Sequence, residues 1–325
     1  MYVSLRFDLR NPAFAGTSMA DRYEAAVGMA EWADNLGCPA SVSMSEHHGS
    51  PDGYIPSPAV ILAAMAARTK NVRFTVAALI VPFHDPLRIA EDFCVLDNIS
   101  KGRVDLIVAG GYVPGEFEMF DVSLKDRARL VREAVEVFRG AFSGKPFEYH
   151  GRKVHITPEP FSERGPAIIL GGSTEAAARR AARIGDGYVP STSDTWQFYR
   201  DEMAKLGKPD PGPGMGGGET SVIALARDPE AGWDAMAPYF LHETNAYGEW
   251  NAQSGKLGPY NAVADADELR ATGRYTVLTP EQMVKQLKAA PMQVAAFHPL
   301  CGGMPIELAW ESLKLFESEV LPHFV

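Results

Sequence analysis

Short runs of β-branched and apolar residues alternate along the chain with longer segments of helical periodicity. The runs that predict strands are 3–7, 40–43, 73–80, 104–109, 167–170, 187–190, 221–226 and 293–297. The segments that predict helices follow them at 19–36, 58–69, 86–99, 125–142, 174–184, 195–206, 230–240 and 305–320. The last segment carries a single apolar stripe made of Ile306, Ala309, Trp310, Leu313, Phe316 and Val320.

Strands that alternate with helices predict parallel βαβ units, and strands that are apolar nearly throughout indicate cover on both faces. Repeated eight times, the unit predicts an α/β fold of the closed (β/α)8 TIM-barrel type. A doubly wound open sheet is the alternative, but no G-x-G-x-x-G opens the first unit. We expect one domain over 1–325, with inserts near 144–165 (a small hairpin), 207–219 and 241–275 that serve as lids or surface loops.

Composition limits the partners and the compartment. The formal net charge is -10, which disfavours nucleic acid and anionic membranes as partners. The cysteines, Cys38, Cys94 and Cys301, lie far apart, which favours buried thiols in a reducing cytoplasm over a disulfide framework. No secretion signal is evident at the N-terminus, and no apolar run approaches the roughly 18 residues of a membrane span. A cytoplasmic protein with a small-molecule substrate is expected.

Glu46-His47-His48 follows the second predicted strand directly. In a parallel barrel this is the end of the strands that carries the active site. An imidazole exchanges protons near neutral pH, and a neighbouring carboxylate can fix its tautomer, so His47 and Glu46 are candidate catalytic residues. Adjacent residues on an extended segment point in opposite directions, so His47 and His48 are poorly placed to chelate one metal ion, and none is expected. A capping cluster at a loop start is the structural alternative.

Two glycine-rich turns are candidates for ligand binding. Gly171-Gly172-Ser173-Thr174 ends a strand and opens a helix, where free N–H groups and hydroxyls can bind phosphate. Simple helix capping explains the same residues. Gly110 and Gly111 end the fourth strand, beside Tyr112, and leave space that a flat ring or a tight turn would use. Phe83, after the third strand, contributes to a substrate wall or to loop packing.

Several segments together resemble the bacterial luciferase-like flavin-dependent monooxygenases. They are Ser45–His48, Val76–Pro82, Arg88–Asp92, Leu96–Arg103, Gly171–Thr174, Gly185–Gly187 and Gly302–Pro305. The match is most specific over residues 45–111, whereas 207–275 matches poorly. Because Ser100–Arg103 lies on a turn at the opposite, stability end of the strands, it identifies the family without being catalytic.

The resemblance implies a barrel that binds FMN or the deazaflavin coenzyme F420. It implies that His47 lies beside the reactive flavin carbon, that Ala77-Ala78 forms a non-proline cis peptide at the ring, and that Gly172, Ser173 and Thr174 contact phosphate. The chain departs from luciferase at Gly110, where luciferase has an arginine, and also has smaller residues in place of luciferase's Glu-Ser. This makes light emission doubtful and leaves the flavin open.

Three functions follow. The first is a monooxygenase that uses reduced FMN from a separate reductase, with Glu46 orienting His47 and with Phe83, Tyr112 and Trp250 as an apolar substrate wall. The second is a deazaflavin-dependent hydride-transfer oxidoreductase on the same barrel. The third is a non-catalytic flavin-binding relative. The resemblance also suggests a homodimer.

Overall fold

The computed structural model describes residues 1–214, 222–255 and 260–324. The chain forms two compact units. Unit 1 comprises Met1–Pro56, Arg68–Arg73 and Thr220–Val325, and unit 2 comprises Ser57–Ala67 and Phe74–Glu219. Each unit gathers segments that are distant in sequence, so the division does not fall at a single linker.

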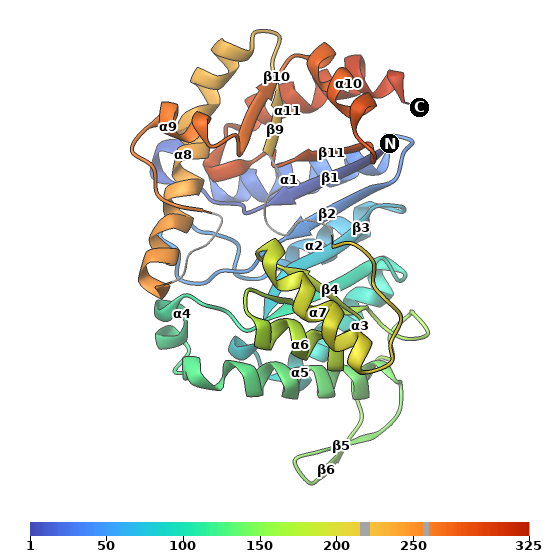
Figure 1. Ribbon diagram of the computed structural model, residues 1–325. Helices are drawn as coiled ribbons and strands as arrows, with labels where there is room; N and C mark the ends of the chain where they lie inside the picture. Colours follow the sequence, from blue (N-terminus) through green and yellow to red (C-terminus); the bar gives the residue numbers. More distant parts are fainter. Residues whose placement is uncertain (215–221, 256–259, 325) are drawn as a thin grey trace. The chain divides into compact units, whose positions relative to one another are not determined.

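Unit 1 holds two parallel sheets within its described residues (Figure 1). In the first, β1 (Tyr2–Phe7) lies between β11 (Val294–Phe297) and β2 (Ala40–Met44). In the second, β9 (Val222–Leu225) pairs with β10 (Tyr275–Leu278). Along β1, the buried residues Val3, Leu5 and Phe7 alternate with the half-buried Ser4 and Arg6. The sequence predicts strands that are apolar nearly throughout, so this polar face is a correction.

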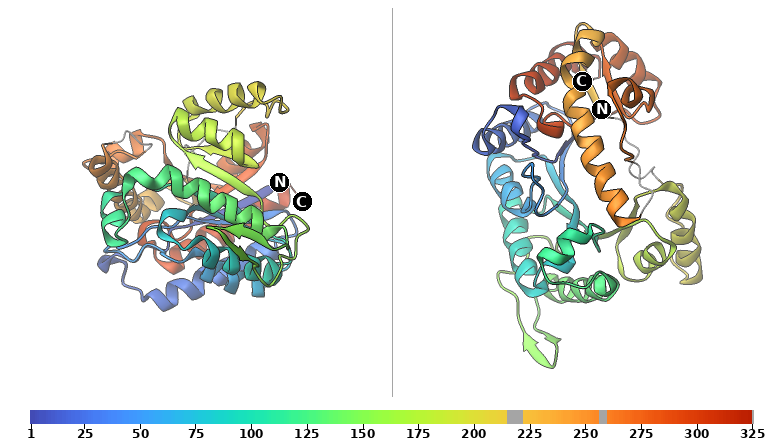
Figure 2. Two further views of the ribbon diagram at one scale, coloured as in Figure 1. Left: turned by 90° about the horizontal axis from the view of Figure 1, so that it is seen from below. Right: turned by 90° about the vertical axis from the view of Figure 1, so that its left-hand side faces the viewer.

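The helices of unit 1 begin at side chains that satisfy free backbone N–H groups. Ser18 caps α1 by accepting the N–H of Asp21, and Thr279 forms a capping box with Gln282 at the start of α10. Figure 2 shows α8 along its length. The helices are α1 (Met19–Asp34), α8 (Pro229–Ser254), α9 (Ala266–Ala271), α10 (Pro280–Ala289) and α11 (Ile306–Leu315).

Unit 2 is built on one parallel sheet within its described residues. From one edge to the other its strands are β3 (Arg73–Ile80, in this unit from Phe74), β4 (Val104–Ala109), β7 (Ile168–Gly172) and β8 (Gly187–Pro190). Its helices are α2 (Pro58–Arg68), α3 (Pro86–Ser100), α4 (Pro114–Met119), α5 (Arg127–Phe142), α6 (Glu175–Ile184) and α7 (Trp196–Lys205). An antiparallel hairpin of β5 (Phe147–Tyr149) and β6 (Arg152–Val154) follows α5 (Figure 1).

The structure confirms the parallel α/β class, the predicted strands in their described parts, and the hairpin. Closure into an eight-stranded barrel stays a prediction, as does the single domain. The predicted insert 241–275 is not one loop, because α8 continues to Ser254 and α9 follows it. The strand β10 and the helix α10 are a βα unit that the sequence analysis missed. Part of the predicted insert 207–219, from residue 215 onward, lies outside the described residues.

Among the described helices, none combines the length and the apolarity that a bilayer span requires.

The turn after α3 explains why Leu96–Arg103 is recognisable. Asp97 is fully buried and accepts hydrogen bonds from the backbone N–H and the hydroxyl of Ser162, at 2.8 Å and 3.1 Å. Arg103 donates to the carbonyl oxygens of Ser100 and Ala66. Gly102 has a φ of +80°, and a Cβ there would lie 2.8 Å from the hydroxyl oxygen of Ser162. These contacts hold together a turn, as the sequence predicts for this segment.

Replacing Asp97 with Ala therefore should lower the free energy of unfolding by about 2 kcal/mol, because two buried donors lose their acceptor. Chemical denaturation measures this loss. The matched control is Asp92→Ala, since Asp92 lies on the same helix and forms an exposed ion pair with Arg88. An Asp97→Ala protein as stable as the control would show that the turn does not depend on this carboxylate.

Candidate functional site

Charged and polar side chains leave unit 1 where its parallel strands end. Asp8 follows β1, Glu46 and His47 follow β2 after one intervening residue, and His298 follows β11. Figure 1 shows these three strands side by side. Because parallel strands present their carboxyl ends at one edge, residues far apart in sequence are brought to the same edge of unit 1.

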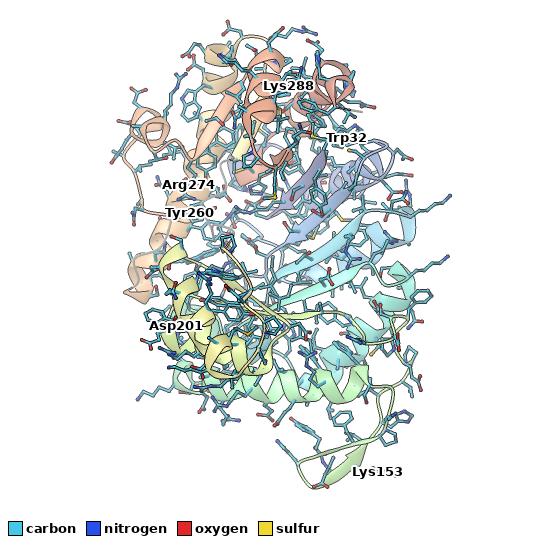
Figure 3. All side chains as sticks on the ribbon, turned by 45° about the vertical axis from the view of Figure 1, so that its right-hand side comes forward. Trp32, Lys153, Asp201, Tyr260, Arg274 and Lys288 are labelled. Carbon is cyan, nitrogen blue, oxygen red and sulfur yellow. The ribbon has the colours of Figure 1, made fainter. Side chains whose placement is uncertain are left out.

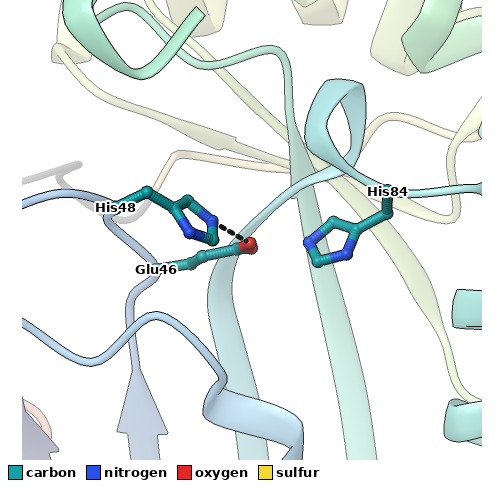
Figure 4. A group of neighbouring side chains, drawn as sticks. All are labelled: Glu46, His48 and His84. Carbon is teal, nitrogen blue, oxygen red and sulfur yellow. Dashed lines mark hydrogen bonds and ion pairs between the residues drawn. The ribbon is translucent and has the colours of Figure 1, made fainter. Parts of the chain in front are cut away.

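The Glu46 carboxylate is buried and bonds to a histidine, as Figure 4 shows. Its Oε1 lies 2.8 Å from Nε2 of His48. The sequence analysis assigns this carboxylate to orienting His47, whereas the structure places it on His48. Glu46 and His48 thus form a pair that fixes the start of the loop after β2.

The imidazole of His47 lies in an aromatic environment and is 6% exposed. The indole of Trp250 stacks on it, with ring centroids 4.2 Å apart and planes inclined by 25°. Tyr54 and Tyr247 meet it edge-on, with centroids at 4.8 Å and 5.8 Å. Two of the predicted site residues, His47 and Trp250, are therefore in contact, and Trp250 fixes the plane of the imidazole.

Behind these rings lies a buried arginine. Arg10 is 1% exposed, and its guanidinium carbon lies 4.7 Å from the ring centroids of both Tyr54 and Trp250. It donates to Asp52 at 2.5 Å, and His242 lies 2.8 Å from the same carboxylate oxygen. Burial alone would raise the pKa of Asp52, but the His242 hydrogen bond and the charge of Arg10 lower it. The rings around His47 thus pack against a buried arginine whose charge is balanced by Asp52.

A second charged group continues this edge. Arg6 donates to the Tyr260 hydroxyl at 2.9 Å and forms an ion pair with the buried Glu243 of α8. Figure 3 shows Tyr260 beside Arg274, whose guanidinium carbon lies 4.2 Å from the tyrosine ring centroid. Burial opposes ionisation of Glu243, yet the charges of Arg6 and His298 hold its pKa well below its usual range. The sequence analysis did not single out Arg6, Arg10 or Glu243.

In unit 2, the peptide bond between Ala77 and Ala78 is cis, as the resemblance implies. The pairing of β3 with β4 shifts here, since Ala77 lies opposite Ile107 and Leu79 lies opposite Val108. Ala78 is thereby the extra residue of a bulge, and its small side chain packs on a cluster of Ile80, Phe83 and Phe117.

The predicted pocket residues after β3 and β4 take different positions. Phe83 is 9% exposed and packs between Phe117 and Phe120, each with ring centroids 4.9 Å away. This favours loop packing over a substrate wall for Phe83. Tyr112 is half-buried. Gly111 has a φ of +67°, and a Cβ there would lie 2.8 Å from Ile80, so a tight turn accounts for it.

The second glycine turn lets a helix approach its strand closely. A Cβ on Gly172 would lie 2.5 Å from Cβ of Ala177 on α6. Thr174 caps α6 by accepting the N–H of Ala177 at 3.2 Å. Ser173 lies between the strand end and this cap. The predicted capping is therefore present. The capped N-terminus of the ten-residue helix α6 lies directly after the end of β7.

Arginines that the sequence analysis passed over lie beside this helix. The Arg180 Nε atom is buried and has no hydrogen-bond partner among the described residues. Burial and the neighbouring charges of Arg132 and Arg127 lower the pKa of Arg180. Arg132, Thr174 and Arg180 also line a groove of about 690 Å³ between α5 and α6. The number of arginines in segments 125–142 and 174–184 is the sequence signal for this cluster.

Arg127 has a further relation to the predicted site. Its Cβ lies 3.5 Å from where a Cβ on Gly110 would stand, so the arginine passes beside the glycine. Gly110 is the position at which the chain departs from luciferase. Arg127, on α5, thus lies next to the position after β4 at which luciferase has an arginine.

Comparisons with known proteins identify the family and the fold. The family model described as luciferase-like monooxygenase matches residues 5–296. Monooxygenase RslO1 from Streptomyces bottropensis is 26% identical, with a TM-score of 0.76 and complete coverage of both chains. The chain spans about half the length of the curated relatives that it matches.

Two further structures share the fold at lower identity. One is the oxygenating constituent of 3,6-diketocamphane monooxygenase from the CAM plasmid of Pseudomonas putida, in complex with FMN. It is 20% identical with a TM-score of 0.73, covering 100% of this chain and 99% of that one. The other, an F420-dependent secondary alcohol dehydrogenase, is 17% identical with a TM-score of 0.63 and 98% coverage of each chain. Since the family model matches most of its length, the chain belongs to the luciferase-like monooxygenase family.

Proposed function

We propose that this protein is a flavin-dependent monooxygenase that uses reduced FMN and O2 to oxygenate a small organic substrate. The observation that carries the proposal is a cluster of arginines in unit 2, in which the buried Nε atom of Arg180 has no hydrogen-bond partner among the described residues. Arg132 and Arg180 line a groove that extends to Thr174, the N-cap residue of α6. Burial and the charges of Arg132 and Arg127 lower the pKa of Arg180, so an anion beside it would be stabilised, and the helix N-terminus adds free N–H groups. A phosphate monoester such as that of FMN matches this site.

The neighbouring strand ends suit the flat part of the same cofactor. β3 and β4 are paired. Ala77 and Ala78 lie in the carboxyl-terminal half of β3, and Gly110 and Gly111 follow β4 directly. These four residues are the smallest that the chain could place against a flat ring. We propose that these residues contact the flavin ring and that Gly171, Gly172, Ser173 and Thr174 contact the phosphate.

When bound and reduced, FMN supplies the electrons that activate O2. The chain would contribute a proton-transfer group and control of water. His47 is the candidate for proton transfer, because its imidazole is held by Trp250, Tyr54 and Tyr247. The same rings shield the imidazole from water, so it would exchange protons with a bound ligand rather than with solvent. Trp250 is thereby a positioning residue rather than a substrate wall.

A second candidate is a deazaflavin-dependent hydride-transfer oxidoreductase, which the likeness in fold to an F420-dependent dehydrogenase supports. A flavin-binding relative without catalysis is the third. We rank the FMN enzyme first because RslO1, which matches over its whole length at 26% identity, is a monooxygenase. A separate flavin reductase, a homodimer and a cytoplasmic location belong to the proposal.

Replacing Arg180 with Ala is expected to weaken FMN binding roughly tenfold to a hundredfold, the loss typical of a charge-assisted hydrogen bond. Riboflavin, which lacks the phosphate, should bind the variant and the unaltered protein equally. Fluorescence titration measures both ligands. Arg139→Ala is the control, since Arg139 lies on α5 outside the groove and already pairs with Asp186. Equal losses for FMN and riboflavin, or none for FMN, would place the phosphate elsewhere.

Replacing His47 with Ala should slow the oxidation of protein-bound reduced FMN by O2 about a hundredfold and remove part of its pH dependence. The dissociation constant for FMN should change by no more than about twofold, because the proposed role is proton transfer rather than binding. Stopped-flow absorbance at several pH values measures the rate. The control is His150→Ala, an exposed histidine on the hairpin. Parallel losses of rate and affinity would refute the proton role.

A further inference from the structure

A second chemical cluster lies within unit 1, apart from the residues assigned to the flavin and to proton transfer. Glu243 on α8, His298 after β11 and Cys301 on the short helix Cys301–Gly303 are buried, with exposures of 0%, 3% and 0%. Asp8, also fully buried, lies beside them. Each of the first three offers one metal-binding atom, and these atoms all lie within 4.8 Å of one another.

The histidine at the centre of this cluster lies between two carboxylates. Its Nδ1 lies 3.4 Å from a Glu243 oxygen, and its Nε2 lies 3.6 Å from an Asp8 oxygen. Within the described residues, neither ring nitrogen of His298 has a hydrogen-bond partner, although both atoms are buried. Buried polar atoms are normally hydrogen-bonded, so an imidazole that contacts two carboxylates without a hydrogen bond to either has a ring nitrogen able to take a ligand.

We propose that Glu243, His298 and Cys301 bind a divalent ion of the zinc type, with Asp8 orienting the imidazole. Sulfur, nitrogen and carboxylate oxygen are the donor types that zinc takes. Nδ1 would bind the metal, while Nε2–H would face Asp8, which is the common arrangement of a metal-bound histidine. The inference does not depend on the flavin.

The distances suit a tetrahedral ion with a small adjustment. Nitrogen and oxygen ligands about 2.0–2.1 Å from one zinc lie roughly 3.4 Å apart, as Nδ1 and the Glu243 oxygen do. The Cys301 sulfur lies 2.9 Å from the other Glu243 oxygen, to which its thiol donates, and this hydrogen bond would be given up when the thiolate binds the ion. Three protein ligands leave a fourth position for water.

Charge is the strongest objection, since Arg6 already pairs with Glu243. A divalent ion together with Arg6 brings three positive charges. Glu243, Asp8 and a metal-bound Cys301 thiolate supply three negative charges, so the cluster is neutral when the ion is present. Arg10 contacts both Asp8 and Asp52, and the one positive charge that it adds is balanced by Asp52. Arg6 can therefore stay beside a bound ion.

The backbone brings Cys301 to this position through a residue that tolerates no side chain. Gly302 has a φ of +57°, and a Cβ there would lie 2.0 Å from the carbonyl oxygen of Tyr239 on α8. The N–H of Gly302 also bonds to Asp8 at 3.2 Å. A bound ion would link the ends of β1 and β11 to α8, the helix that carries Trp250 to His47.

The test is a metal analysis of tag-free protein, produced in medium supplemented with zinc sulfate because a buried site fills during folding. Mass spectrometry of the metal content should find about one zinc ion per chain. The variants Cys301→Ser and His298→Asn should lose it. Cys94→Ser should retain it, since Cys94 is a buried thiol on α3 in unit 2.

A second measurement covers variants that fail to fold. Unaltered protein produced with cobalt chloride in place of zinc should show the intense near-ultraviolet absorption of a cobalt–thiolate bond. Zinc content below about a tenth of an ion per chain, or absence of that absorption, would overturn the proposal. Full occupancy that survives both substitutions in folded protein would also overturn it.

Discussion

Parallel pairing of β1 with β2 and β11 is the constraint on which unit 1 depends. The ladder sets Val3 against Ala40 and Leu5 against Phe297, so all three strands point the same way. Their next residues must then emerge at one edge. This is why side chains nearly 300 positions apart, such as Asp8 and His298, lie in the same cluster. The chemistry of this edge follows from strand direction before any particular contact forms.

Buried charge is the second requirement, and the chain meets it by pairing. Removing a carboxylate or a guanidinium from water is costly unless an opposite charge accompanies it. Arg10 meets Asp52, and Arg6 meets Glu243. Arg180 is different, because burial and the charges of Arg132 and Arg127 lower its pKa, and its Nε atom has no hydrogen-bond partner among the described residues. That contrast is why we assign an anionic ligand to unit 2.

Much of the fold could be predicted because its signals are local. The predicted strands are β-rich runs bounded by turns, and Glu46 and His47 could be chosen because they follow such a run. The unit of β10 and α10 was missed since Tyr275 reads as part of an aromatic insert. The Thr279-Pro280-Glu281-Gln282 capping signal would have revealed it. The predicted helix 230–240 is shorter than α8, which continues to Ser254. Pro238 and Gly248 are typical helix breakers, yet both lie inside this helix.

The parts of the site that could not be predicted depend on contacts between distant segments. Nothing in the sequence pairs Arg6 with Glu243, or sets Trp250 on His47, until α8 packs beside the ends of β1 and β2. In the sequence, Arg180 is one of several arginines in the predicted helix 174–184. Its buried Nε atom, which sets it apart from the others, is evident only in the structure. The Ala77-Ala78 cis peptide was available only through family resemblance, because two alanines carry no local signal for it.

The central claim is that the chain binds FMN through its phosphate and its ring. The most direct measurement is a parallel titration of the unaltered protein with FMN and with coenzyme F420, followed by fluorescence. The account predicts that FMN binds at micromolar concentration or below and more tightly than F420. Tighter binding of F420 would favour the hydride-transfer enzyme, and binding of neither would contradict the account.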